Sequence, residues 1–91
     1  MSQTLKDRTK KFALDVWFLC SHLPHTREYN NYINQLLRCS SSVAANYRAA
    51  MRAKSNADFI NKLKIVEEEA DESQFFLELL SKINSNEQLH P

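Results

Sequence analysis

Hydrophobic and small residues repeat along the chain at alternating intervals of four and three residues, in three separate segments. That spacing keeps one stripe on a single side of an α-helix and is typical of helices packed nearly parallel in a bundle. Strands would need alternation with a period of two, which nowhere persists. The inward stripes run through Leu5, Thr9, Phe12, Val16, Leu19 and Leu23, then Tyr29, Ile33, Leu36, Ser40, Val43, Tyr47 and Ala50, and finally Phe59, Leu63, Val66, Ala70, Ser73, Leu77 and Leu80.

Local signals divide the chain into helices. Thr4, Thr26 and Ser55 each precede a stripe and are able to cap a helix through the side-chain hydroxyl. Pro24 stops the first helix, and Asn84 lies in a polar "NSN" that indicates the end of the third. We therefore predict an all-α, up-and-down antiparallel helical bundle with helices at residues 4–22, 27–53 and 56–84, in one domain over residues 1–86 with a short tail at 87–91.

Composition supports this reading and adds a constraint on size. The chain has no glycine and two prolines, as expected for a nearly all-helical protein with brief turns. A domain of 91 residues buries only about 60–65% of its unfolded surface, so self-association would help to stabilise it. Small side chains at Ser40, Ala44 and Ala50 predict close approach of neighbouring helices to the second helix.

The second half of the third predicted helix is apolar on both sides. Opposite its inward stripe lie Phe75, Leu79 and Ile83, with Phe76 nearby. A helix that is apolar nearly all round is normally buried all round, and two companion helices cannot cover it. We therefore predict that Phe75, Phe76, Leu79 and Ile83 form an interface through which copies of the chain associate.

The net charge of +1 conceals a strong asymmetry. Residues 1–64 carry an excess of seven positive charges, and residues 65–91 an excess of six negative charges. On the second helix, four arginines fall within an arc of about 80° nearly opposite the stripe, and no acid shares that outer face. This basic strip, with three lysines nearby, is our candidate nucleic-acid-binding surface: Arg27, Arg38, Arg48, Arg52, Lys54, Lys62 and Lys64. The alternative is a solvated face, or one that pairs with acids of the same bundle or of a neighbouring subunit.

A family resemblance appears over residues 5–84. Its motifs are "QLLR" before a run of small residues, then "NYRAAMRAKS", "ADFINKL" and "EEEADES" followed by aromatic and aliphatic residues. They resemble the bacterial four-helix bundle family of 23S rRNA intervening-sequence proteins, which is related to the accessory variability protein of diversity-generating retroelements. The resemblance implies an up-and-down bundle, commonly a homopentamer, without known enzymatic activity. The retroelement relative is a basic barrel that assists a reverse transcriptase and touches nucleic acid. The family usually has a fourth helix, whereas here only "SNEQLHP" follows the third.

No constellation predicts catalysis, a metal or a cofactor. In the run from Glu67 to Glu72, Glu67 and Glu69 flank the inward stripe while Glu68 and Glu72 face away, and the alternative to metal ligation is pairing with Lys or Arg across helices or subunits. The one Glu-x-x-His pair is Glu87 with His90. Four residues able to bind zinc occur at no recognised spacing, namely Cys20, His22, His25 and Cys39. Trp17, Tyr32, Phe75 and Phe76 suit a core or an interface, or alternatively a base-stacking platform. For Asn46, an interhelical hydrogen bond and a functional contact both remain open.

Compartment and function follow from these observations. The first eleven residues lead into no secretory apolar run, and no stretch approaches the ~20 apolar residues of a membrane span. We expect a cytoplasmic, non-catalytic, oligomeric helical-bundle protein that binds RNA, DNA or a nucleic-acid enzyme such as a reverse transcriptase, with no small-molecule substrate. The alternative is a scaffold module that binds protein and has no nucleic-acid role.

Overall fold

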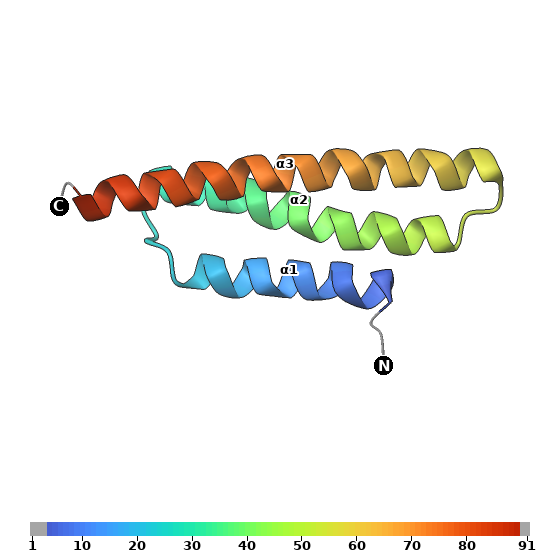
Figure 1. Cartoon of the computed structure of the whole chain (residues 1–91), viewed down its shortest axis with the longest axis horizontal. Coiled ribbons are helices and arrows are strands. Elements are labelled where there is room, and N and C mark those ends of the chain that lie inside the picture. The colour runs from blue at the N-terminus through green and yellow to red at the C-terminus, as the bar shows by residue number, and fades with distance from the viewer. Residues whose placement is uncertain (1–3, 90–91) are drawn as a thin grey trace.

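The computed structural model describes residues 4–89, with side chains for residues 4–86, and forms three helices. These are α1 (Leu5–Ser21), α2 (Arg27–Met51) and α3 (Asn56–Leu89), which run up and down in antiparallel order (Figure 1). Within the described residues there is no strand. The predicted all-α bundle is therefore confirmed, while its completion by self-association stays a prediction.

Each helix begins directly after the residue that was predicted to cap it. The hydroxyl oxygen of Thr4 accepts a hydrogen bond from the backbone N–H of Asp7 at 3.1 Å. Thr26 caps α2 in the same way at 3.2 Å, and Ser55 caps α3 at 3.1 Å. Each bond satisfies one of the backbone donors that a helix start leaves unpaired, so these side chains fix the starts locally.

The C-terminal end of α3 differs from the prediction. The helix continues to Leu89 rather than ending near residue 84, so the predicted tail at 87–91 begins inside the helix. The "NSN" at residues 84–86 lowers helical propensity by only a few tenths of a kcal/mol per residue. No proline or glycine interrupts the chain there, so nothing local stops the hydrogen-bonded ladder.

The central helix is α2, which packs against both α1 and α3 (Figure 1). The backbones of α1 and α3 do not come into contact, and the molecule measures 53 × 29 × 16 Å. A groove of about 420 Å³ therefore separates α1 from α3, with Phe12, Val43 and Leu77 among its apolar lining residues. The three helices form an open array in which α2 is covered far better than its two neighbours.

The core lies where the second half of α1, the first half of α2 and the second half of α3 meet. Its buried members are Val16, Cys20, Tyr29, Ile33, Leu36, Cys39 and Leu80. On α2 the predicted stripe is confirmed, since every position but the half-buried Tyr47 is buried.

On α1 the predicted stripe holds less well than on α2. Leu5 is 52% exposed and Leu19 is 47% exposed, whereas Cys20 turns inward and is 4% exposed. Because the backbone of α1 lies close to that of α2 and not to that of α3, only a narrow line of its side chains is covered. A straight helix also drifts away from a strict seven-residue repeat, and this moves the buried position from residue 19 to residue 20.

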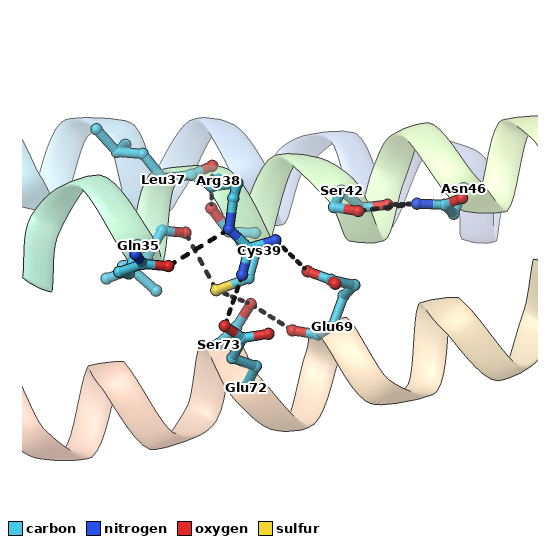
Figure 2. Close-up of polar contacts among 11 residues, drawn as sticks. Gln35, Leu37, Arg38, Cys39, Ser42, Asn46, Glu69, Glu72 and Ser73 are labelled. Carbon is cyan, nitrogen blue, oxygen red and sulfur yellow. Dashed lines mark hydrogen bonds and ion pairs between the residues drawn. The ribbon is translucent and has the colours of Figure 1, made fainter.

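Small side chains mark the closest approach of α2 and α3. Ser40 and Ser73 have no exposed surface. The Ser73 hydroxyl donates to the backbone oxygen of Glu69 at 2.8 Å and lies 3.3 Å from the Cys39 sulfur across the helix pair (Figure 2). Of the three small residues predicted to face a neighbouring helix, Ser40 and Ala50 are buried and Ala44 is half-buried.

Candidate nucleic-acid interface

A second groove, of about 730 Å³, lies between α1 and α2. We call it the basic groove. Its lining comes from the first turns of α1 and the last turns of α2, which the antiparallel arrangement places beside each other (Figure 1). The lining residues are Lys6, Asp7 and Lys10 of α1 and Ser41, Ala44, Ala45, Arg48 and Arg52 at the C-terminal part of α2.

Helical spacing gives the basic groove two cationic walls. Lys6 and Lys10 are four residues apart on α1, and Arg48 and Arg52 are four apart at the end of α2, so each pair shares one face. Between the walls, Ser41, Ala44 and Ala45 expose no charge and little bulk. A ligand entering the groove would therefore meet cations on both sides and a floor of small residues.

The cations of the basic groove lack internal partners. None of Lys6, Lys10, Arg48 and Arg52 forms an ion pair within residues 4–86. Asp7 is the one acid in the lining, which leaves an excess of three positive charges. Like charges gathered without counter-charges repel each other, so the groove favours a polyanion over empty solvent.

Arg38 does not belong to this surface, because it pairs with acids of the same bundle, which is the alternative that the sequence left open for the basic strip. Its guanidinium contacts Glu69 at 3.2 Å and Glu72 at 2.5 Å across the α2–α3 interface, and its Nε lies 3.4 Å from Gln35 Oε1 (Figure 2). The hydrogen bond with Glu72 and the attraction of both carboxylates raise the pKa of Arg38. Pairing across helices was open for the whole strip, and of its four arginines it is Arg38 that lies beside the acids of α3.

The other candidate cations are spread over the molecule. Arg27 is almost fully exposed at the start of α2 and pairs loosely with Glu28 at 3.4 Å. Lys54 lies in the α2–α3 turn, and Lys62 is half-buried on α3. Lys64 lies in a shallow pocket whose other lining residues are Glu67, Glu68 and Asp71. Of the seven predicted residues, the structure brings only Arg48 and Arg52 together, and it adds Lys6 and Lys10, which the sequence analysis missed.

The predicted self-association surface on α3 has two parts. Phe76 and Ile83 pack partly against the chain's own core, whereas Phe75 is 56% exposed and Leu79 is half-buried. The rings of Phe75 and Phe76 meet edge to face, with centroids 5.1 Å apart. Phe75 and Leu79 thus remain the outward part of this surface, beside a pocket of about 410 Å³.

A further apolar surface lies on α1. Leu14, Trp17 and Phe18 are each at least 50% exposed, and the two rings meet edge to face at 5.2 Å. Trp17 and Phe18 follow Leu14 by three and four residues, and this helical spacing could have indicated the surface from the sequence.

The groups considered for metal binding do not gather. Within the described residues, no three His, Cys, Asp or Glu side chains come together as a metal site would require. His22 Nδ1 lies 2.8 Å from the backbone oxygen of Phe18, while Glu87 and His90 lie outside the described side chains. Asn46 donates to Ser42 of the same helix, at 3.0 Å to the backbone oxygen and 2.8 Å to the hydroxyl, so its amide is engaged within α2 (Figure 2).

Both cysteines are free and buried, and we expect them to be unreactive in the folded protein. Burial raises the pKa of the Cys20 thiol and so suppresses the nucleophilic thiolate. Labelling by a thiol reagent near pH 8 should be roughly a hundredfold slower in the native protein than in urea, because it requires opening of the core. Rapid native labelling of Cys20 would contradict its place in the core.

The raised pKa of the Cys20 thiol also predicts that the stability of the fold depends on pH. The thiol's ordinary pKa is 9.0, and the folded state raises it. The contribution of Cys20 to the free energy of unfolding is fully present below pH 9 and is lost as the pH rises. The thiol of the unfolded chain releases its proton first, which stabilises the unfolded state. Urea midpoints at neutral and alkaline pH should therefore diverge more for the native protein than for Cys20→Ala.

The geometry first defines a class, that of small all-α helical bundles. Within the described part of the chain, no helix is both long enough and apolar enough to cross a bilayer. The sequence model of the 23S rRNA-intervening sequence protein family matches residues 2–89, and the chain belongs to that family.

A solved structure agrees with this assignment. The crystal structure of a protein of unknown function from the S23 ribosomal protein family of Bacteroides thetaiotaomicron is 39% identical to this chain, with a TM-score of 0.80. The match covers 88% of this chain and 74% of that one. No curated protein sequence gives a significant match. Neither similarity indicates a catalytic family.

Proposed function

We propose that this protein is a non-catalytic nucleic-acid-binding protein that works as an assembly of several copies. The observation that carries the proposal is the basic groove, which is lined by four cations that form no ion pair within residues 4–86. Neutral net charge would argue against a polyanion ligand if the charges were mixed. Here they are separated, because the acids of α3 are concentrated in the run from Glu67 to Glu72, near the middle of that helix.

Electrostatics supplies the mechanism. Lysine and arginine that approach phosphates release the counterions condensed on the nucleic acid, which drives binding without sequence specificity. A single groove with a few contacts binds weakly. Several copies held around an axis raise the overall affinity by the effective concentration of the neighbouring sites.

Self-association is part of the proposal, with the pentamer of the resembling family as the expected form. Its support is the exposed apolar area on α3, where Phe75 is 56% exposed and Leu79 is half-buried. Monomers rarely leave such surfaces uncovered. Light scattering on protein freed of nucleic acid should give a mass several times 10.6 kDa. A monomer at micromolar concentration would exclude the multi-copy mechanism.

Binding of labelled single-stranded RNA should be strong at low salt and weak at moderate salt. Four phosphate contacts to a single strand predict that the affinity falls about 50-fold between about 50 and 200 mM salt. Fluorescence anisotropy with RNA and DNA of matched length provides the measurement. If neither nucleic acid binds at the lower salt concentration, the proposed function is wrong.

A protein-binding scaffold is the second candidate, favoured by the same exposed apolar side chains. In that case Phe75 and Leu79 would contact a different protein, for example a nucleic-acid enzyme, and the protein itself would be indifferent to RNA and DNA. Co-purification with a distinct protein partner, together with no binding of RNA or DNA at low salt, would favour this second function.

A further inference from the structure

We propose that the basic groove is the binding site for the phosphodiester backbone of single-stranded nucleic acid, with Trp17 stacking on a base beside it. This inference rests on the proposed function and makes it specific. It moves the site from the outer strip of α2 to the α1–α2 junction, and it assigns roles to three residues of α1.

The charge balance of the groove distinguishes it from the other cationic places on the molecule. Arg38 is held by Glu69 and Glu72, and Lys64 lies among three acids. In the basic groove, by contrast, cations of α1 and α2 line the same space, and Asp7 is the one acid in the lining. Four counter-charges from one ligand would relieve that repulsion, and phosphates repeated along a strand supply them.

The shape of the groove favours a backbone over a compact anion. Its volume of about 730 Å³ is far larger than a single phosphate requires. Lys6 and Lys10 are separated by about 6 Å along the helix axis, and so are Arg48 and Arg52. The small side chains of the floor let an extended ligand lie between these walls.

Trp17 favours a single strand as the ligand. It lies seven residues after Lys10, on the same face of α1 and about 10 Å further along the axis. The indole is 56% exposed, and its other ring contact is with Phe18. An exposed aromatic ring beside a cationic groove is the arrangement by which proteins hold unpaired bases, because every base offers a face for stacking. An acidic peptide would satisfy the lysines but would make no such use of the ring.

Trp17 is the one tryptophan of the chain, so its emission reports on this site directly. Titration of the full-length protein with a short oligouridylate should quench the emission at about 50 mM salt, and raising the salt to about 200 mM should reverse most of the quenching. Duplex DNA of equal length should quench little, since its bases are stacked internally. If the oligouridylate binds at full affinity without quenching the tryptophan emission, the role proposed for Trp17 is wrong.

Paired charge-removal variants test the groove. The double variants K6Q/K10Q and R48Q/R52Q should each weaken RNA binding about tenfold or more at low salt. The slope of log affinity against log salt concentration should also become shallower by about 1.4, the value for two lost phosphate contacts. Arg27→Gln and Arg38→Gln are the controls, alone and combined: each removes one positive charge from α2 outside the groove, and R27Q/R38Q matches the two charges that each groove variant removes. Circular dichroism confirms that all variants are folded.

The outcomes separate the inference from the proposed function. If the unmodified protein binds RNA and the groove variants bind it equally well, the groove assignment is wrong while the function stands. If Arg27→Gln weakens binding as much as R48Q/R52Q does, the effect is one of net charge, and the assignment again fails. If the unmodified protein binds neither RNA nor DNA, both are overturned.

Discussion

Replacing Leu36 with alanine is expected to lower the free energy of unfolding by ~2–5 kcal/mol. Leu36 has no exposed surface and lies within the cluster where all three helices meet. Because α1 and α3 do not contact each other through their backbones, α2 is the element that holds them both. A cavity at Leu36 would therefore weaken both helix pairs at once. Domains of this size have about 5–15 kcal/mol in total, so the variant would be close to unfolding.

Urea unfolding followed by circular dichroism gives the measurement. Leu14→Ala is the matched control, since it removes the same atoms from a side chain that is 50% exposed on α1. That variant should change the free energy of unfolding by no more than ~0.5 kcal/mol. Equal effects of the two substitutions would show that α2 is not the centre of the fold. Protein concentration must be held constant, because association would make both midpoints depend on it.

Replacing Ser73 with leucine is expected to cost about 1–3 kcal/mol by overpacking. Ser73 is fully buried, and its hydroxyl lies against the Cys39 sulfur of α2. A leucine side chain would push α3 away from α2 or adopt a strained rotamer. Because Glu72 precedes Ser73 in the chain, the Arg38 ion pairs should lengthen at the same time. The expected readout is a lower urea midpoint.

Ser73→Ala serves as the control for size. It removes the hydroxyl without adding volume, and the backbone of α3 is unchanged, so a change within about 1 kcal/mol is expected. A leucine variant as stable as the alanine variant would mean that α2 and α3 are less closely packed at this point than the structure indicates. The two substitutions together separate the steric effect from the loss of the hydroxyl's hydrogen bonds.

The Arg38 ion pairs illustrate what sequence reasoning left open but could have located. Residues equally far from a tight antiparallel turn lie side by side on the two helices it joins. Arg38 lies 14 residues before Arg52, and Glu69 lies 14 residues after Ser55. That count would have removed Arg38 from the basic strip. No such count finds the basic groove, because its four cations come from helix ends whose lateral rotation depends on packing.

The sequence by itself determined the three helices, their capped starts and the buried stripe of α2. These depend on hydrogen bonds and periodicity within a few residues, which are local and visible in the printed order. Only the tertiary structure decided that α1 and α3 stay apart, that Lys6 and Lys10 face Arg48 and Arg52, and that Arg38 is paired. Those features follow from how whole helices rotate and pack against one another, which residues distant in sequence set jointly.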